Sequence, residues 1–485
     1  MGTLNLDIEE LQDLDLDQLL EAEAEWLRYN QLEQIYSEDG PFGISKYAKH
    51  REIFEATAKY DHVCAMGGNG TGKTYGIGGY LTTLHLTGLY PRWWKGLRFP
   101  YPIKARACGD TRQTMREVIQ PVLFGDFAEK GEEFYGTGLI PRHLLLKRKI
   151  VSNTNGLIDY AAIRHVPSNG ISTLQLRAYE QGREAFQGTK FHWIWEDEEP
   201  DNEIHEENEM RGRGVDGKIL LTFTPLSGFS EVVESFLKFE ETNKQGGSMY
   251  CAHIAWNDVP HLTEEWKRKR LAKMKPHLRK SRVFGIPSGG DAMVYPVDEE
   301  FIICKPFPIP DHFRRVAGFD HGWHNTAAVW VAYDKDEDMA YIYGEYKRGE
   351  VTIEVHATAL KARGAWIPFL GDSSARDSDG TQIVNKYKTL GVRMRLPDKA
   401  VDAGIQEVLE RLDSGRLKIF STCPKWIEEY RRYRYKADTN GIPQVVKQND
   451  HLMDATRYAI YAGLKVAEHN PGTRTPRDIT SNMTF

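Results

Sequence analysis

The sequence predicts a two-domain α/β protein, with a parallel-sheet domain in the N-terminal half and a mixed-sheet domain in the C-terminal half. Three observations support this prediction. The chain has 485 residues, which is too long for one ordinary hydrophobic core. Helical and strand-like segments alternate from about residue 45, and a glycine-rich turn follows the first short strand. After residue 310, three strand-like segments follow one another before helices and strands alternate again.

Composition and charge indicate a soluble globular protein. Apolar residues make up 40% of the chain, charged residues 27%, and the net charge is −6. The N-terminus, MGTLNLDIEELQDLDLDQ, is too acidic and too interrupted for a signal peptide, and no run is long enough to cross a bilayer. The five cysteines lack CxxC spacing, which fits reduced thiols and gives no zinc signature. These features predict a cytoplasmic protein without a membrane segment.

The N-terminal half has the order of a βα unit. Residues 5–37 form an acidic amphipathic pattern, which fits either a solvated helix or a docking arm for a partner. The segment SKYAKHREIFEATAKY has a helical pattern, HVCAM that of a short buried strand, and further strands are expected in 191–200 and 218–226. A buried strand that leads through a glycine-rich turn into a helix is the entry to a parallel sheet.

That turn, GGNGTGKT, satisfies the phosphate-binding pattern GxxxxGK[ST]. In such a loop backbone N–H groups wrap the phosphates, the lysine reaches the β and γ phosphates, and the hydroxyl contacts magnesium. A plain glycine-rich turn with a surface lysine is the alternative, but the position between a strand and a helix favours a P-loop. The expected nucleotide contacts are Gly67, Asn69, Gly70, Thr71, Gly72, Lys73 and Thr74.

A P-loop needs an acidic pair at the end of a neighbouring strand, and WIWEDEEP supplies it. In the usual register Asp197 serves the Mg²⁺ ion and Glu198 orients the attacking water. Glu196 stands where an apolar residue is usual. The acidic pair could therefore also be shifted by one residue along the sequence. A capped acidic helix start is the alternative, but it does not account for the apolar residues that precede the acids.

Two further features belong to this expected site. TFTP, residues 222–225, ends the next strand, where its hydroxyls could sense the γ-phosphate; a simple strand end is the alternative. Nearby arginines are candidates for an arginine finger that acts on its own subunit or on a neighbour. These are Arg112, Arg116, Arg183, Arg211 and Arg213.

The C-terminal half has the order of an RNase H-like sheet. RRVAGFDHGW, TAAVWVAYD and MAYIYGEYK predict three consecutive antiparallel strands, with a DKDED turn between the last two. The strand WIPFLGDSS follows, then helices, and finally the helix HLMDATRYAIYAG. The whole chain is therefore expected to join a P-loop NTPase with a parallel-sheet core to an RNase H-like mixed-sheet domain.

Three aspartates stand where carboxylates converge in such a sheet. Asp320 and Asp372 end two strands, and Asp454 begins the last helix. Carboxylates held together need cations, and two divalent ions could clamp the attacking and leaving oxygens of a phosphodiester. Hard oxygen ligands favour Mg²⁺ or Mn²⁺ over zinc. The alternative for Asp454 is structural: Asp450 caps the helix and Arg457 pairs with Asp454.

Other charged residues have less specific expectations. The basic segments 267–282 and 430–436 fit either a DNA contact or a solvated helix face. Five residues near the three aspartates in sequence could assist them, but turn or surface positions are expected for each: His321, His324, Asp377, Asp379 and Asp450.

We expect five consecutive regions along the chain. They are an acidic helical arm (1–40), a P-loop ATPase domain (41–290), a linker rich in glycine and proline (291–310), an RNase H-like nuclease domain (311–467) and a disordered tail (468–485).

An NTPase followed by a two-metal nuclease resembles the large terminase subunit of tailed bacteriophages, and in particular the headful-packaging type of short-tailed phages. The resemblance covers nearly the whole chain. Its segments, in order, are KHREIF, GGNGTGKT, YEQGREAFQG, WIWEDEEP, LTFTPLSGFS, VFGIP, GFDHGW, GDSS and NDHLMDATRY.

This resemblance implies a genome-packaging motor. ATP hydrolysis would drive double-stranded DNA through the portal into a preformed capsid, and the C-terminal domain would cut the concatemer. It implies ATP and Mg²⁺ as cofactors, with Mn²⁺ able to replace Mg²⁺ at the nuclease site. The implied partners are the portal protein, the small terminase subunit and further copies of the chain in a ring of five. The protein would work in the host cytoplasm and transiently on the procapsid, and would be absent from the mature virion.

The resemblance also assigns residues. Lys73 and Thr74 would contact phosphate and magnesium, Asp197 would hold the metal and Glu198 would act as the catalytic glutamate. Arg183 lies where relatives carry functional arginines. The nuclease ligands would be Asp320, Asp372 and Asp454. A glutamine that often reads adenine in such proteins is replaced here by His50, which leaves adenine selectivity open.

Two other functions fit the sequence less well than the packaging motor. A helicase or repair translocase with an accessory nuclease would need a second motor domain, and residues 230–300 are too short and too basic to hold one. A capsid-docking structural protein with vestigial sites does not fit the complete P-loop and the intact carboxylates.

Overall fold

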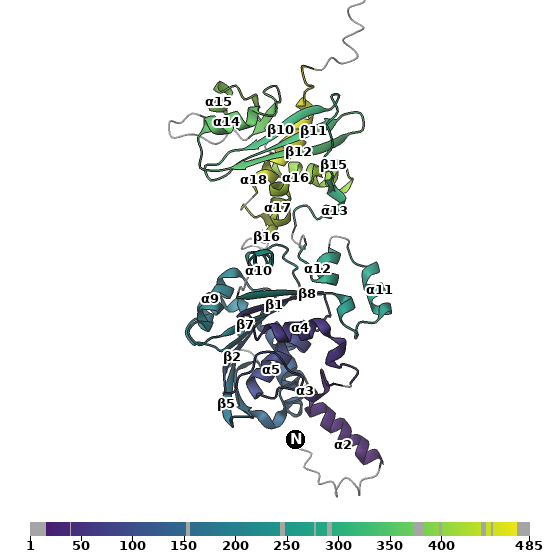
Figure 1. Ribbon diagram of the computed structural model, residues 1–485, viewed down its shortest axis with the longest axis vertical. Coiled ribbons are helices and arrows are strands. Elements are labelled where there is room, and N and C mark those ends of the chain that lie inside the picture. Colours follow the sequence, from purple (N-terminus) through teal and green to yellow (C-terminus); the bar gives the residue numbers. More distant parts are fainter. Residues whose placement is uncertain are drawn as a thin grey trace, which may run out of the picture. The chain divides into compact units, whose positions relative to one another are not determined.

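The computed structural model describes residues 16–38, 40–151, 156–242, 248–275, 278–288, 293–371, 382–396, 400–437, 443–447 and 450–472. The chain divides into two compact units, Met1–Ser288 and Gly289–Phe485, each built around its own sheet (Figure 1). No helix in the described ranges is both long and apolar enough to span a membrane.

The first unit contains an eight-stranded sheet, counted over its described residues. Six neighbouring strands run parallel, from β5 through β2, β6, β7 and β1 to β8. At one edge β4 pairs antiparallel with β5, and β3 pairs antiparallel with β4. The predicted parallel-sheet core is therefore confirmed. In sheet order the strands are β3 (Leu145–Ile150), β4 (Ile158–His165), β5 (Gly170–Ala178), β2 (Lys104–Gly109), β6 (Trp193–Asp197), β7 (Lys218–Phe223), β1 (His62–Gly67) and β8 (Met249–Ile254).

Alternate residues of the central strands face opposite sides of this sheet, because side chains alternate along a strand. In β1, Val63 and Ala65 join one core and Cys64 and Met66 the other. Helices α4 (Ala48–Ala56) and α5 (Tyr80–Thr87) contribute to the first core, and α9 (Asn202–Gly212) and α10 (Glu231–Thr242) to the second. Both faces are covered, which explains why the strands are apolar throughout rather than alternating.

The first unit also contains helices at its N-terminal end and several shorter helices between and after its strands. The expected acidic arm contains α2 (Leu16–Tyr29), which has no buried residue, and the short α3 (Gln31–Gln34); residues 1–15 lie outside the described ranges. Further helices are α6 (Arg112–Thr114), α7 (Gln120–Phe124), α8 (Phe127–Lys130), α11 (Glu264–Ala272) and α12 (Arg279–Phe284).

The second unit contains a mixed sheet in which β10, β11 and β12 are consecutive and antiparallel, as predicted. Parallel neighbours flank this meander on both sides. In sheet order the strands are β14 (Met394–Arg395), β13 (Phe369–Gly371), β10 (Arg314–Asp320), β11 (Thr326–Asp334), β12 (Met339–Arg348), β15 (Leu417–Phe420) and β9 (Ile303–Cys304). A separate ribbon pairs β16 (Tyr435–Ala437) with β17 (Pro443–Val445). The helices are α13 (Glu299–Ile302), α14 (Ile353–Lys361), α15 (Ile383–Thr389), α16 (Val401–Asp413), α17 (Pro424–Arg432) and α18 (His451–Tyr458).

Helix α18 packs directly on β10, and Gly318 makes this close approach possible. A Cβ atom at Gly318 would lie 1.7 Å from the carbonyl oxygen of Ala455, so any larger residue would push the helix away from the strand. Asp320 lies two residues further along the same strand. The glycine therefore helps to set how closely the acidic end of β10 and the start of α18 meet.

The ends of the second unit differ from the sequence expectation. Within the predicted linker 291–310, Val294 and Tyr295 are buried in the core of this unit, and the Tyr430 hydroxyl donates a hydrogen bond to the Tyr295 carbonyl. These apolar residues outweigh the glycine and proline content that suggested a linker. Glu468, placed in the predicted tail, pairs with Arg393 and Arg395; residues 473–485 lie outside the described ranges.

Candidate functional site

The P-loop joins the carboxyl end of β1 to a π-helix, η2 (Lys73–Gly79). Gly72 adopts a left-handed conformation with φ +82°, which glycine tolerates without strain. The buried Lys73 ammonium donates hydrogen bonds to the carbonyls of Gly67 (3.1 Å) and Gly68 (2.8 Å). Burial lowers the Lys73 pKa to about 8. Lys73 is therefore held inside the loop where the phosphates of the nucleotide are predicted to bind.

Asp197 lies beside the P-loop at the end of β6. Its carboxylate accepts hydrogen bonds from the hydroxyls of Thr74 (3.0 Å) and Thr222 (2.6 Å), and the Trp195 indole donates in turn to Thr222 (2.7 Å). Burial raises the pKa of Asp197 to about 7, and the negative charge of Glu198 acts in the same direction. The predicted magnesium hydroxyl and the predicted magnesium carboxylate are therefore in contact, and both offer hard oxygen atoms.

Glu198 has a backbone conformation that is unusual for a residue with a side chain. Its φ is +63°, a left-handed value that costs about 1–2 kcal/mol. The backbone is fixed by a hydrogen bond from the Glu198 N–H to the Thr222 carbonyl (3.0 Å) and by one from the Tyr179 hydroxyl to the Glu198 carbonyl (3.2 Å). Burial raises the pKa of the Glu198 carboxyl. A strained backbone conformation that neighbouring groups hold in place is typical of functional positions.

Glu196 faces away from this site, which bears on the open question of register. It is fully buried on the other side of the sheet, where it accepts hydrogen bonds from Asn208 (2.6 Å) and contacts His205 (2.7 Å) of α9. Side chains alternate along β6, so Glu196 and Asp197 cannot face the same side. Of these two carboxylates, the structure places Asp197 against Thr74.

The two predicted sensor threonines both contact the site. Thr224 donates a hydrogen bond to the Gly67 carbonyl (2.8 Å) and approaches the Asn69 amide oxygen (3.2 Å), while Thr222 binds Asp197. The other loop residues are held from behind: the Trp256 indole donates to the Asn69 carbonyl (2.9 Å), and His261 contacts the Gly70 carbonyl (2.7 Å).

A cavity of about 410 Å³ opens beside Gly72, lined by His50, Tyr47, Tyr75 and His261 among others. Burial lowers the pKa of His50 to about 3, so this histidine is neutral. Its Nε2 contacts the Thr71 carbonyl (2.9 Å) and its Nδ1 contacts the Tyr36 hydroxyl. Both ring nitrogens are therefore occupied, and His50 supports the loop.

The candidate arginines are spread over several elements. Arg183, whose side chain is 51% exposed, pairs with Glu207 of α9 (3.2 Å), and Arg211 pairs with the other oxygen of Glu207 (3.1 Å). Arg116 lies 3.9 Å from Glu129, and the Arg112 backbone N–H donates to Glu180 (2.9 Å).

The second acidic site forms where β10 ends and α18 begins. Asp320 lies 2.7 Å from Nδ1 of His451. Burial raises the pKa of Asp320, and the charges of Asp454 and Asp450 raise it further, which places the three carboxylates in one electrostatic cluster. The hydrogen bond to Asp320 raises the pKa of His451. Asp450, expected at a turn or surface, is instead buried here.

Asp454 has cationic partners within its own chain. One carboxylate oxygen lies 3.0 Å from the Lys447 ammonium and the other 3.1 Å from the Arg457 guanidinium. Lys447 also pairs with Asp450 (3.0 Å). Pairing with Arg457 agrees with the structural alternative for Asp454, but Asp450 does not supply the side-chain cap. That cap comes from Glu429 of α17, which accepts from the Leu452 N–H (2.6 Å).

The third predicted nuclease ligand, Asp372, lies outside the described residues, as do Asp377 and Asp379. Strand β13 ends at Gly371, and it pairs in parallel with β10 so that Gly371 is opposite Phe319. Of the predicted trio, the described chain therefore brings together Asp320 and Asp454.

The two basic segments differ in how much of their side-chain surface is exposed. In 430–436, Tyr430 and Tyr433 are buried in the core, and Arg431 pairs with Glu299 (2.7 Å), so the interleaved tyrosines are structural. In the described part of 267–282, Lys269 pairs with Glu265 on the exposed surface of α11.

Sequence reasoning missed several residues of these sites. His451 and Lys447 contact the nuclease carboxylates, and the spacing of His451 and Asp454, one helical turn apart, was a signal that could have identified the histidine. Tyr179 and His261 contact the ATPase site from positions distant in sequence, and no local pattern marked them.

Comparison with known proteins agrees with both halves. Residues 64–301 match the family model for the terminase large subunit, T4likevirus-type, N-terminal, and residues 317–462 match the terminase RNaseH-like domain. The second match confirms the predicted RNase H-like fold.

Among individual relatives, the large terminase subunit of Salmonella phage P22 is 32% identical, covering 97% of this chain and 96% of that protein. The large terminase subunit of Enterobacteria phage LP7 is 34% identical over 51% of this chain and 52% of that protein. The solved P22 large terminase nuclease domain is 32% identical, with a TM-score of 0.34, and covers 40% of this chain and 100% of that one. The chain belongs to the family of phage terminase large subunits, the DNA-packaging enzymes that combine an ATPase with a nuclease.

Proposed function

We propose that this chain drives double-stranded DNA through the portal into the procapsid by ATP hydrolysis in its first unit, and cuts concatemeric DNA with its second. The observation that carries the proposal is the contact between Thr74 of the P-loop and Asp197 of β6. This contact brings together the P-loop and the acidic strand end, the two parts that a P-loop ATPase needs. The other unit of the same chain holds several carboxylates at the end of the antiparallel strands of its RNase H-like sheet.

In the ATPase unit, Thr74 and Asp197 would hold Mg²⁺. When bound, the ion would neutralise phosphate charge. Lys73 would exchange its bonds to the Gly67 and Gly68 carbonyls for phosphate oxygens. Glu198, held in place by the Thr222 carbonyl and the Tyr179 hydroxyl, would orient the attacking water and accept its proton.

We place the nucleoside of ATP in the cavity beside Gly72. Tyr47, Tyr75 and His261 line it and provide aromatic faces for a base. His50 takes no direct part in reading the base, because both of its ring nitrogens are occupied. It would instead hold Thr71, and with it the loop, in the binding geometry.

In the nuclease unit, Asp320 and Asp454 would hold Mg²⁺ or Mn²⁺ together with Asp372. When bound, two such ions would stabilise the attacking and leaving oxygens of a phosphodiester. The carboxylate donor set fits these hard cations. Lys447 pairs with Asp454 and would have to move from that carboxylate for a metal to bind there.

Assembly completes the proposal. The chain would act in the host cytoplasm as a ring of five copies on the portal of the procapsid, with the small terminase subunit selecting the DNA, in the headful mode of cutting, and would leave before the virion matures. Arg183, whose side chain is half-exposed, would leave its pairing with the buried Glu207 and reach a neighbouring subunit as the arginine finger.

A packaging assay tests the proposal. Purified chain, procapsids with portal, linear DNA and Mg·ATP should protect DNA from added nuclease, and Lys73→Ala should protect none. A strand-displacement assay on the same preparation tests the helicase alternative. Unwinding of a duplex without any protection of DNA by procapsids would overturn the packaging proposal.

A further inference from the structure

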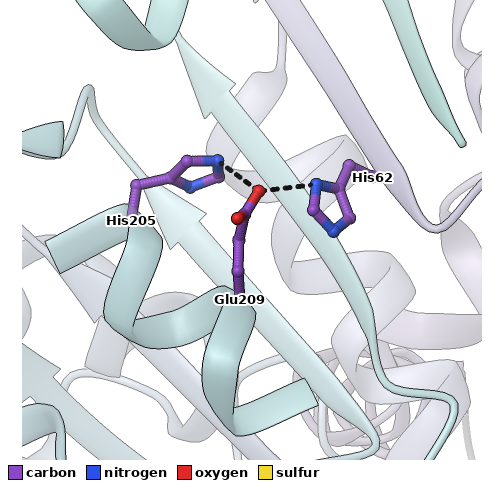
Figure 2. A group of neighbouring side chains, drawn as sticks. All are labelled: His62, His205 and Glu209. Atoms are coloured by element: carbon purple, nitrogen blue, oxygen red, sulfur yellow. Dashed lines mark ion pairs between the residues drawn. The ribbon is translucent and has the colours of Figure 1, made fainter. Parts of the chain in front are cut away.

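A cluster of metal-ligand side chains lies in the first unit, away from the nucleotide site. Figure 2 shows His62, His205 and Glu209 directed toward one another. His62 is the first residue of β1, whose opposite end carries the P-loop. His205 and Glu209 are one turn apart in α9, so both project from the same face of that helix.

The spacing of the ligand atoms fits a tetrahedral ion. Oε1 of Glu209 lies 3.1 Å from Nδ1 of His62 and 3.5 Å from Nε2 of His205, and the three ligand atoms all lie within 4.8 Å of one another. Two ligands of a tetrahedral zinc ion, each about 2.0–2.1 Å from the metal, are about 3.3 Å apart. The measured distances bracket this value, so small side-chain movements would suffice.

The two histidine nitrogens that face Glu209 also lack ordinary hydrogen bonds. Nδ1 of His62 and Nε2 of His205 are buried, and neither makes a hydrogen bond of good geometry with the described chain. A buried nitrogen without such a bond is costly. His205 is 4% exposed, and a cation between the three groups would supply the partner that both nitrogens lack.

The far side of His205 has the arrangement that ligating histidines usually have. Its Nδ1 lies 2.7 Å from Glu196, whose other oxygen accepts a hydrogen bond from Asn208 (2.6 Å). A carboxylate at this position fixes the ring and directs the remaining nitrogen lone pair to a metal. This gives the fully buried Glu196, which the nucleotide site does not use, a specific purpose.

We propose that His62, His205 and Glu209 bind one divalent transition-metal ion of the zinc type, with Glu196 orienting His205. Two imidazoles favour such an ion over Mg²⁺. A cavity of about 400 Å³, lined by His62 and Glu209, gives access for the ion and for water as a fourth ligand. The ion would fasten α9 to β1 and, through Glu196, to β6, the two strands that lead to the P-loop and to Asp197.

The competing explanation is a proton in place of the metal. A doubly protonated His205 would form ion pairs with Glu196 and Glu209 and would satisfy the same geometry. The two explanations differ in one observable, which is stoichiometric zinc binding that depends on His62 and Glu209.

The test is equilibrium dialysis of the full chain against Zn²⁺ in excess Mg²⁺, with bound zinc measured by mass spectrometry. Excess Mg²⁺ competes for the oxygen-rich sites, and Asp454→Ala removes the nuclease site as a second zinc ligand set. We expect one tightly bound zinc per chain in wild type and in Asp454→Ala. His62→Ala and Glu209→Gln should each weaken binding about 10-fold or more. Glu206→Gln, an exposed glutamate of the same helix, is the matched control and should bind as wild type.

A second measurement covers variants that fold poorly. Zinc should raise the thermal unfolding midpoint of wild type and of Glu206→Gln but not that of Glu209→Gln, because a ligand stabilises only the form that binds it. Co²⁺ should give wild type a tetrahedral visible spectrum that Glu209→Gln lacks. Absence of zinc binding by wild type, or equal binding by wild type and both ligand variants, would overturn the proposal. Neither measurement involves ATP or DNA, so its failure leaves the packaging proposal untouched.

Discussion

The two acidic sites of this protein hold their carboxylates in opposite ways. In the first unit, Asp197 is bound by the hydroxyls of Thr74 and Thr222, while Lys73 acts on it through its charge and donates its hydrogen bonds to backbone carbonyls. In the second unit, Asp454 is paired with Lys447 and Arg457, and Asp320 with His451.

This difference has a consequence for metal binding. Burial makes ionisation of the Asp197 carboxyl costly and raises its pKa to about 7, so a cation bound directly to the carboxylate would stabilise its ionised form. Asp320 and Asp454 already pair with His451, Lys447 and Arg457, and a metal bound by these carboxylates would compete with those partners. We infer that the ATPase site is prepared for its cofactor in the isolated chain, whereas the nuclease site is restrained until something moves the cations.

The largest effect is expected from Lys73→Ala. Loss of the ammonium from the P-loop should reduce ATP hydrolysis by about 100-fold or more, measured as phosphate release. Mn²⁺-dependent plasmid cleavage should persist, because the nuclease carboxylates lie in the other unit. If cleavage also disappears in folded protein, the two sites are not independent and the comparison fails.

Glu198→Gly separates catalysis from strain at one position. Hydrolysis should fall by about 100-fold through loss of the general base. The thermal unfolding midpoint should not fall, because glycine accepts a φ of +63° without the steric cost that glutamate bears. Glu198→Gln is the matched control, with equally low activity and no gain in stability. A clear drop in the midpoint of the glycine variant would show that this backbone is unstrained.

The buried histidines of the first unit predict a pH dependence of stability. Burial lowers the pKa of His50 to about 3 from an ordinary value of 6.5. Below pH 6.5, His50 binds a proton in the unfolded chain but stays neutral in the folded chain. Its contribution to the free energy of unfolding is therefore fully present above pH 6.5 and is lost as the pH falls toward about 3. Between about pH 7.5 and about pH 5.5, this histidine should lower the free energy of unfolding by about 1.4 kcal/mol.

Urea unfolding of wild type and His50→Gln over that pH range measures the effect. The variant should lose less stability on acidification than wild type. His85, whose pKa burial also lowers to about 3, remains in both proteins, so the slope should shrink rather than vanish. Equal slopes would mean that His50 is protonated in the folded state.

The smallest effect is expected from Lys447→Ala. Its ammonium competes with a metal for Asp454, but the lysine is 60% exposed, and exposed pairs contribute about 0.2–1 kcal/mol. The Mn²⁺ concentration for half-maximal cleavage should therefore fall by about 1.5- to 5-fold. Lys388→Ala, at an exposed position of α15, should leave it unchanged. A higher Mn²⁺ requirement in Lys447→Ala would contradict the restraint.

Much of the architecture could be predicted because it depends on local pattern. The buried strand before GGNGTGKT and the three consecutive strands after residue 310 each have a periodicity and a turn that favour one arrangement. Within the range predicted as a linker, Val294 and Tyr295 belong to the core of the second unit and Tyr295 accepts a hydrogen bond from Tyr430 of α17. Composition does not reveal what a segment rich in glycine and proline packs against.

Site prediction was limited in a different way. Position on a strand pointed to Asp197 and Asp320, because strand ends gather functional groups. The partners Thr222 and Lys447 determine how the carboxylates are held, and they depend on which elements meet in three dimensions. The opposite orientation of Glu196 and Asp197 follows from alternation along β6, so the register was in principle readable once the strand was assigned.

The central claim is that Asp454 is a metal ligand rather than only the partner of Arg457. The most direct measurement incubates supercoiled plasmid with Mn²⁺ and either wild type or Asp454→Ala at matched folded content, with Asp413→Asn, an exposed position, as control. Wild type and the control should cut the plasmid, and the folded Asp454→Ala should not, while its ATPase activity persists. Equal cutting by wild type and Asp454→Ala, or cutting by neither, would contradict the account.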